Sequence, residues 1–154
     1  MLQNLTLTTD SMVAANKQLT PVKPVESHNG CLLCGNQNPL SMRLKFAADS
    51  NLDVHADFKP HEMLQGYRGI LHGGVICALL DSAMVNCLFH QNISAVTAEM
   101  QVKFIHPVNC GENLHLCAHI DKAFPPLYTM KAELSCSGQI CATAVAKFMQ
   151  NSRF

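Results

Sequence analysis

The chain has 154 residues, of which 48% are hydrophobic and 14% are charged, and its formal net charge at pH 7 is zero. This size and composition suit one globular domain with a sizeable core. A chain with no excess of positive charge lacks the electrostatic footprint of most nucleic-acid-binding proteins. We therefore expect no nucleic-acid partner.

The first 27 residues are predicted to form a polar tail or an extended arm. They contain Pro21 and Pro24 and show no sustained hydrophobic period. The opening stretch, MLQNLTLTTDSM, lacks the basic and apolar regions of a secretory signal. We therefore expect a cytoplasmic protein whose eight cysteines are free thiols rather than a disulfide framework.

A turn-rich segment follows, with the spacing Cys31-x-x-Cys34 and with His28 three residues earlier. A zinc site would need a fourth ligand, which His61 or Cys110 would have to supply. A redox CxxC is favoured at the start of a helix, where the thiolate is stabilised, and this one is not so placed. The sequence favours a structural turn with packed thiols and no metal, with zinc and redox roles as alternatives.

The middle of the chain predicts a hairpin and then a long buried helix. Alternating residues predict strands at 42–46 and 52–58, joined by a connection over 47–51. A nearly continuous apolar run predicts a buried helix over about 72–90. Asp81 lies near its middle, and a lone carboxylate in a buried helix is costly unless something pairs with it or uses it. The run is also short for a membrane span, so we expect no membrane partner.

Alternation returns after the helix and predicts four more strands, at about 96–104, 114–121, 130–135 and 140–148. The short loops between them indicate an antiparallel meander. One face of such a sheet can bury a single apolar helix while the other face stays polar. The predicted fold class is therefore α+β, with one antiparallel sheet wrapped around one long central helix.

This order of elements, together with three stretches of sequence, resembles the hotdog-fold acyl-CoA thioesterases, specifically the PaaI-like group. The stretches are GYRGILHGGVICALLDSA, TAEMQVKFIHP and CLLCGNQNPLSMRLKF. The resemblance covers about residues 28–150, which we predict to be a single hotdog domain. It implies hydrolysis of an acyl-CoA thioester to a carboxylic acid and free CoA, without a cofactor. It also implies a homodimer or homotetramer with sites at the subunit interface.

The resemblance assigns the catalytic residues around the start of the helix. Two glycines after His72 leave backbone N–H groups open to a ligand. Gly73 is the implied donor that polarises the thioester carbonyl, with Gly74 nearby, and Asp81 is the implied general base or nucleophile. Thr97 lies where relatives place a hydroxyl residue that helps to position the water.

Substrate binding is assigned to the segment before the helix, through His72, Gln65, Gly66 and Arg68. Several relatives carry Asn or Gln six positions before the histidine, where this chain has Gly66. Either Gln65 substitutes through a shifted loop, or the backbone N–H groups act alone. Basic side chains could also meet the CoA phosphates, and the candidates are Arg68, Lys103, Lys122 and Lys131.

Structural roles are the alternatives for the same residues. His72 could be only a residue of the helix start, the two glycines could serve close packing, and Asp81 could pair with a backbone group or across an interface. Thr97 could be an ordinary strand residue. The alternative function is a non-catalytic hotdog domain that binds acyl-CoA or another small ligand. A dehydratase or hydratase of this fold is less favoured, because its Asp and His motif is not found.

Spacing along the helix bears on how the site is assembled. Nine positions separate His72 from Asp81, which is roughly 13 Å at about 1.5 Å per residue. One thioester carbonyl cannot meet both ends of that span. We therefore predict that Asp81 and the His-Gly-Gly segment of one site belong to different subunits.

Overall fold

The computed structural model describes residues 18–23 and 25–153 of the chain. Its elements, in chain order, are β1 (Thr20–Pro21), the 3-10 helix η1 (Glu26–His28), β2 (Ala47–Ala48), β3 (Val54–Phe58), the 3-10 helix η2 (Glu62–Leu64), α1 (Gly73–His90), β4 (Ala95–Phe104), β5 (Leu114–Phe124), β6 (Leu127–Cys136) and β7 (Gln139–Gln150). The long helix and the four strands after it occupy the predicted parts of the chain.

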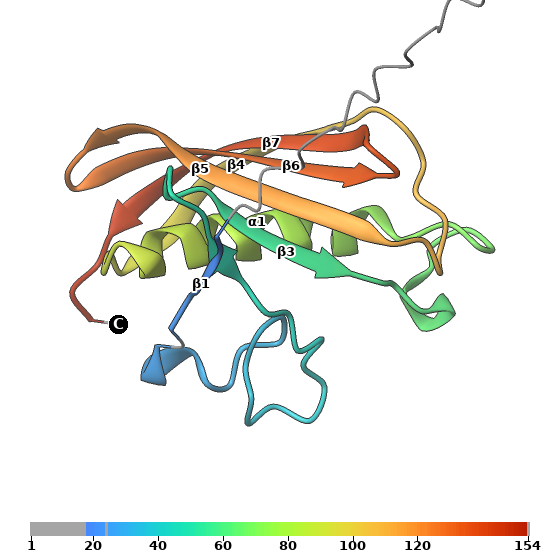
Figure 1. Cartoon of the computed structure of the whole chain (residues 1–154), viewed down its shortest axis with the longest axis horizontal. Coiled ribbons are helices and arrows are strands. Elements are labelled where there is room, and N and C mark those ends of the chain that lie inside the picture. Colours follow the sequence, from blue (N-terminus) through green and yellow to red (C-terminus); the bar gives the residue numbers. More distant parts are fainter. Residues whose placement is uncertain (1–17, 24, 154) are drawn as a thin grey trace, which may run out of the picture.

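In the described part of the chain, the strands form one seven-stranded sheet that curves around α1 (Figure 1). Its order is β1-β2-β3-β5-β6-β7-β4, and every neighbouring pair is antiparallel. The long strands β5, β6 and β7 form a meander over the helix. The predicted α+β architecture, one sheet wrapped around one helix, is confirmed.

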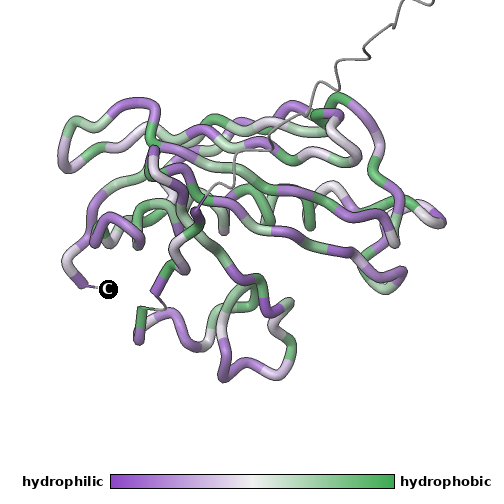
Figure 2. Tube along the Cα trace, in the orientation of Figure 1, coloured by the Kyte–Doolittle hydropathy of each residue, from purple (hydrophilic) through white to green (hydrophobic). Residues whose placement is uncertain are grey.

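The core lies between α1 and the concave face of the sheet. Hydrophobic positions run nearly without interruption along α1 and alternate with polar ones along the strands (Figure 2). The helix buries Leu79, Leu80 and Met84, while Leu116 and Phe148 close the core from the sheet. Each such side chain contributes about 1.5–3 kcal/mol when it is fully removed from water. This burial fixes the direction in which the helix crosses the sheet.

The helix α1 begins with a side-chain cap. His72 has extended backbone angles, φ −63° and ψ 132°, and its ring accepts a hydrogen bond from the Gly74 N–H. By length and composition α1 could cross a membrane, but more than half of its residues are buried inside this domain. It is the core helix of the fold, as predicted.

One face of α1 is less buried than the apolar run predicts. Cys77, Ala78, Asp81 and Val85 are only half-buried, and their spacing places them along one stripe of the helix. The residues on the opposite face are buried against the sheet. The sheet therefore wraps most of the helix and leaves an open stripe that carries Asp81.

The first hairpin differs from the prediction. Ala47–Ala48, predicted to lie in the connection, form β2, whereas residues 42–46 form no strand. The turn comes later because the buried Asp49 carboxylate accepts a hydrogen bond from the Asn51 N–H at 2.8 Å. Leu52, predicted to begin the strand over 52–58, lies outside it, is 48% exposed and has a φ of +67°. The turn that the Asp49 carboxylate stabilises therefore sets where the first strand of the hairpin lies, which is later in the chain than the alternation over 42–46 predicts.

The predicted meander of the last four strands was wrong for the first of them. The strand β4 pairs with β7 rather than β5, and β3 takes the place beside β5. Because β4 and β5 are not neighbours in the sheet, the segment between them crosses the end of the sheet. Val108 anchors this segment, since its side chain is fully buried and its carbonyl accepts a hydrogen bond from the Leu71 N–H at 2.8 Å. As a result β4 is an edge strand of ten residues, most of them exposed.

The predicted N-terminal arm contains a strand. Thr20 and Pro21 pair with Ala48 and Ala47, which makes β1 the other edge of the sheet. The rest of the predicted arm, residues 1–17, lies outside the described residues. All eight cysteines fall within the described part, and none of them forms a disulfide there.

Candidate functional site

Asp81 and Thr97 form a pair between α1 and β4. The Thr97 Oγ1 donates a hydrogen bond of 2.6 Å to Asp81 Oδ1. Burial raises the pKa of Asp81 above its ordinary value, while the Thr97 hydrogen bond and the charge of His28 pull that pKa down and offset part of the shift. A carboxylate whose pKa moves towards neutrality is a better proton acceptor in water activation. The pair has the chemistry of a general base held by a hydroxyl.

A β-bulge places Thr97 at this position. The register between β4 and β7 shifts between Thr97 and Glu99, so one extra residue bends the strand. Bulges re-aim side chains and occur often beside active sites. Simple alternation along β4 does not reveal this shift.

An apolar cavity of about 330 Å³ lies beside the Asp81–Thr97 pair. Its walls come from η1, from α1, and from the start of β4 together with the residue before it. The lining residues are Ser27, His28, Val85, Phe89, Ser94, Ala95, Val96 and Thr97. Val85 is one helical turn beyond Asp81, and Thr97 both lines the cavity and bonds to the carboxylate, so Asp81 lies beside the cavity. The arrangement can hold a hydrophobic group with its polar end at Asp81.

The start of α1 presents one unpaired backbone donor. The Gly74 N–H is taken up by His72 Nδ1 at 2.8 Å, which is the helix cap. The Gly73 N–H has no acceptor within the described part of the chain, and it lies at the positive end of the helix dipole. The Phe104 ring lies 3.5 Å from where a Gly73 Cβ would be. Of the two predicted backbone donors to a ligand, Gly73 and Gly74, only the Gly73 N–H is therefore available.

The loop before α1 holds the other predicted binding residues. The Gln65 Oε1 accepts a hydrogen bond from the Gly69 N–H at 2.9 Å, so this side chain is engaged within its own loop. Gly66 lies against the His72 ring, 3.3 Å from where its Cβ would be. Arg68 is exposed and, among the described residues, forms no ion pair.

The predicted basic residues differ in their availability. Lys131 Nζ is 2.7 Å from Asp121 Oδ1 on the neighbouring strand, so its charge is already paired. Lys103 is exposed on β4 next to Phe104, and within the described residues it has no ion-pair partner. Lys103, Arg68 and Lys122, which is also exposed and without an ion pair among the described residues, are therefore better candidates for an incoming phosphate than Lys131.

The predicted site residues form two groups within one chain. The structure brings Asp81 and Thr97 together, and it brings Gly66, His72 and Gly73 together at the start of α1. The two groups are separated by the first half of the helix. A single chain therefore holds both halves of the predicted chemistry but does not bring them together.

Sequence reasoning missed His28 as a neighbour of this site. Its ring packs edge-on against Phe89, with ring centroids 4.9 Å apart. Burial lowers the pKa of His28, while the negative charge of Asp81 raises it and offsets part of the effect. No local pattern pairs His28 with Phe89, 61 positions later, so only the folded arm reveals the contact.

The predicted turn at Cys31 and Cys34 brings both thiols near His28. The Cys34 Sγ is 3.4 Å from His28 Nδ1. Burial is the main cause that raises the pKa of the Cys34 thiol to about 11. Because the thiolate is the nucleophile in disulfide exchange, this thiol is poorly suited to redox chemistry at neutral pH.

Comparison with known proteins places the fold. Residues 68–142 match the family model of the thioesterase superfamily. A solved thioesterase superfamily protein matches with a TM-score of 0.74 and 21% identity, over 79% of this chain and 60% of that one, so the chain spans three-fifths of its length. A search of the curated proteins found no significant match.

Two further solved structures share the fold at lower similarity. A hypothetical thioesterase from Streptococcus pneumoniae, solved with coenzyme A, has a TM-score of 0.63 and 15% identity, over 64% of this chain and 81% of that one. The PaaI protein from the phenylacetic acid degradation operon of E. coli has a TM-score of 0.61 and 17% identity, over 63% of this chain and 75% of that one. Together with the helix-wrapping sheet, these matches show that the chain has the hotdog fold, and residues 68–142 match the thioesterase superfamily.

Proposed function

We propose that this protein is an acyl-CoA thioesterase that hydrolyses an acyl-CoA to a carboxylic acid and free CoA. The observation that carries the proposal is the Asp81 carboxylate, held by Thr97, a residue that lines the apolar cavity. The cavity would take the acyl chain. The Asp81 carboxylate would then lie next to the thioester carbonyl at the polar end of that chain.

The proposed reaction uses few groups. Asp81 accepts a proton from a water molecule as the water oxygen bonds to the carbonyl carbon. The carbonyl oxygen becomes an oxyanion, which accepts a hydrogen bond from the Gly73 N–H at the positive end of the helix. The carbon–sulfur bond then breaks, and CoA leaves as a thiolate that takes up a proton. A thiolate is a good leaving group, so no strong acid is required at the sulfur.

We propose that two copies of the chain complete each site. Asp81 and Gly73 are too far apart on α1 to act on one carbonyl within a chain, because eight helical positions span about 12 Å. The open stripe of α1 and the exposed edge of β4 offer a surface for a second copy. Three large apolar side chains around the start of α1 are also strongly exposed, namely Met63 at 88%, Tyr67 at 87% and Phe104 at 55%. The assembly is a homodimer, or a homotetramer built from such dimers.

The solved relatives support this assignment of residues. The Streptococcus pneumoniae thioesterase has been solved with Asp→Ala and with Thr→Ala replacements at positions sixteen apart in its sequence. Asp81 and Thr97 are also sixteen positions apart. The same protein was solved with coenzyme A, and a Streptococcus mutans relative was solved with acetyl-CoA. We extend the ligand class and the pair of residues to this chain, and we place the protein in the cytoplasm.

The test is an acyl-CoA panel of increasing chain length with the purified full-length protein. Free CoA should be measured by chromatography, because the protein's own eight thiols would react with a colorimetric thiol reagent. We expect turnover of at least one acyl-CoA. If no acyl-CoA is hydrolysed while one still raises the melting temperature, the protein is a binding domain and the enzymatic proposal is wrong.

A further inference from the structure

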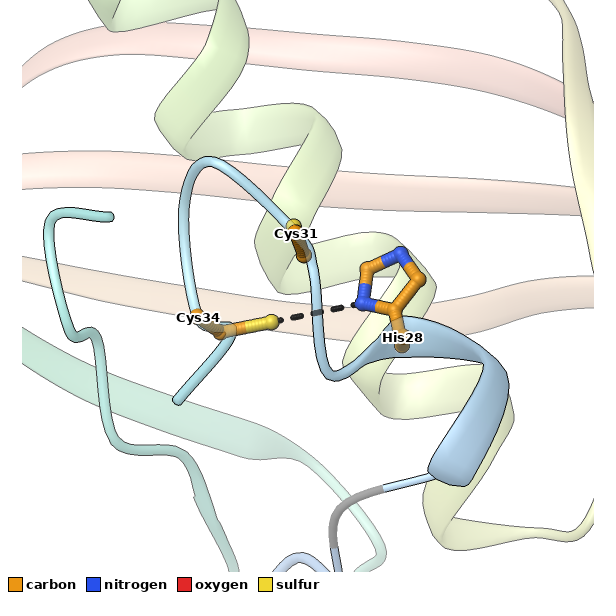
Figure 3. Close-up of side chains that lie close together, drawn as sticks. All are labelled: His28, Cys31 and Cys34. Atoms are coloured by element: carbon orange, nitrogen blue, oxygen red, sulfur yellow. Dashed lines mark hydrogen bonds between the residues drawn. The ribbon is translucent and has the colours of Figure 1, made fainter. Parts of the chain in front are cut away.

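The arm segment holds a cluster of metal-ligating side chains that thioester hydrolysis does not use. His28, Cys31 and Cys34 each offer one ligand atom, and the three atoms lie within 4.8 Å of one another (Figure 3). We propose that these residues bind a Zn²⁺ ion, with a water molecule as the fourth ligand. This inference does not depend on the proposed thioesterase activity.

The spacing of the ligand atoms suits zinc. Zn–S bonds of about 2.3 Å and Zn–N bonds of about 2.0–2.1 Å put sulfur and nitrogen about 3.6 Å apart across a tetrahedron. The His28 Nδ1 to Cys34 Sγ distance is 3.4 Å. In Figure 3 the Cys34 sulfur points at the His28 ring, and Cys31 lies on the other side of the same loop. A bound ion would draw the three ligand atoms, which lie within 4.8 Å of one another, into this arrangement.

The loop that carries the cysteines is built for close approach. A Cβ on Gly35 would lie 2.4 Å from Asn29 O and 2.4 Å from the Cys31 backbone nitrogen, so the position accepts only glycine without rearrangement. The Gly35 N–H donates to Cys31 O at 3.0 Å, which closes the loop. This backbone holds Cys31 and Cys34 near each other before any ion binds.

Hydrogen-bond donors surround both sulfur atoms. The Leu33 N–H donates to Cys31 Sγ at 3.3 Å, and Asn86 Nδ2 donates to Cys34 Sγ at 3.6 Å. Such outer contacts orient metal ligands and stabilise thiolates. One of these donors belongs to the loop itself and the other to α1, so the cluster lies between the loop and the helix.

Ser82 on α1 adds an independent observation. Its side chain is buried, with 5% of the residue exposed, and its Oγ has no hydrogen-bond partner within the described part of the chain. A buried hydroxyl without a partner carries a free-energy cost of about 1–3 kcal/mol. Ser82 is one helical turn before Asn86, whose Nδ2 donates to Cys34 Sγ at 3.6 Å. A metal-bound thiolate at Cys34 would be a strong acceptor for this hydroxyl.

The donor set selects the metal. Two thiolates and one imidazole favour zinc over magnesium or calcium, which prefer oxygen ligands. A set of three protein ligands with one open position is also used by zinc in proteins. The described residues offer no fourth side chain within the cluster, and the earlier candidates His61 and Cys110 are not part of it.

The ion would fix one wall of the apolar cavity. Ser27 and His28 line that cavity, and the arm that carries them is otherwise held by the β1–β2 pairing, by short hydrogen-bonded turns and by the His28–Phe89 ring contact. A metal bond to His28 and to both cysteines would tie η1 to the following loop. The zinc site is therefore a clamp on the arm that borders the candidate active site.

The test is zinc binding to the reduced, untagged, metal-stripped full-length protein. We expect one equivalent of Zn²⁺ per chain after dialysis, measured by elemental analysis, and two of the eight thiols protected from alkylation. Co²⁺ in its place should give the absorption of a tetrahedral thiolate site. Because these measurements use the wild-type chain, they stand even if a variant does not fold.

Variants locate the ion. The double variant C31S/C34S should lose the bound equivalent, and H28N should lose the tetrahedral Co²⁺ spectrum. The control C77S/C110S removes two half-buried thiols outside the cluster and should keep both. The proposal is overturned if the wild type retains no zinc, or if C31S/C34S retains as much as the control.

Discussion

The backbone of Gly73 offers an unusually clean test of oxyanion stabilisation. Gly73 is the first residue of α1, where proline is well tolerated because the N–H has no partner in the helix. The preceding residue, His72, already has φ −63° and ψ 132°, the region that a residue before proline prefers. The substitution Gly73→Pro should therefore remove the candidate donor while the helix stays intact.

The expected magnitude follows from the role of the lost donor. Loss of one oxyanion donor lowers turnover by about 10²–10³-fold, or about 2.7–4 kcal/mol of transition-state stabilisation. Stability should not fall, and the restricted unfolded chain could raise it by about 0.4–1 kcal/mol. We expect Gly73→Pro to lose activity by that factor and to melt at or slightly above the wild-type temperature.

The control for this substitution is Gly73→Ala. It keeps the N–H and adds a Cβ in ordinary contact with the Phe104 ring, at 3.5 Å. Hydrolysis of the best acyl-CoA and thermal unfolding by circular dichroism should be measured for both variants. If Gly73→Pro folds and retains activity within a few-fold of Gly73→Ala, the Gly73 N–H does not stabilise the oxyanion.

Three further results follow from the structure. Thr97→Val removes a hydrogen bond that lowers the pKa of Asp81, so that pKa should rise. Because the base acts when ionised, the acid limb of the pH–rate profile should move to higher pH, and an unmoved limb would contradict this role. Val85→Phe fills part of the cavity and should exclude methylene groups of long acyl chains while sparing acetyl-CoA. Each excluded methylene should lower kcat/KM about fourfold, since burying one methylene is worth about 0.8 kcal/mol. Leu79→Ala, at a position with no exposure, should lower the free energy of unfolding by about 2–5 kcal/mol in chemical denaturation.

Much of the fold could be predicted because its signals are local. The apolar run that ends at His90 is long enough to be a helix, and alternation marks the strands that cover it. Strand order is not a local property, so the meander prediction placed β4 beside β5. The buried Val108, which anchors the crossing segment, lies in a stretch with no period.

The candidate site was predictable only in part, for a related reason. Asp81 is conspicuous because a carboxylate is costly in an apolar helix, and the glycines mark the helix start. The contact of His28 with Phe89 and the bulge beside Thr97 depend on how distant segments meet. The donor at Gly74 was expected to be open, but the His72 ring takes it up.

The central claim is that the Asp81 carboxylate activates water, and the variant Asp81→Asn tests it most directly. The amide keeps the size of the side chain and can still pair with Thr97. Burial raises the pKa of Asp81, so the folded state holds the carboxyl proton more tightly than the unfolded chain does. The ionised carboxylate therefore lowers the stability of the fold as the pH rises through the pKa of Asp81 in the folded state. The neutral variant should therefore be at least as stable as the wild type at neutral pH.

The measurement is single-turnover hydrolysis of the best acyl-CoA by Asp81→Asn, beside Glu99→Gln as a control. Glu99 is exposed on the same strand as Thr97 and pairs with Lys147 at 2.8 Å. Loss of a general base should slow hydrolysis by about 10²–10⁴-fold in Asp81→Asn, with acyl-CoA binding and the oligomer retained, while the control stays near the wild-type rate. Hydrolysis by Asp81→Asn at the rate of the control would contradict the account.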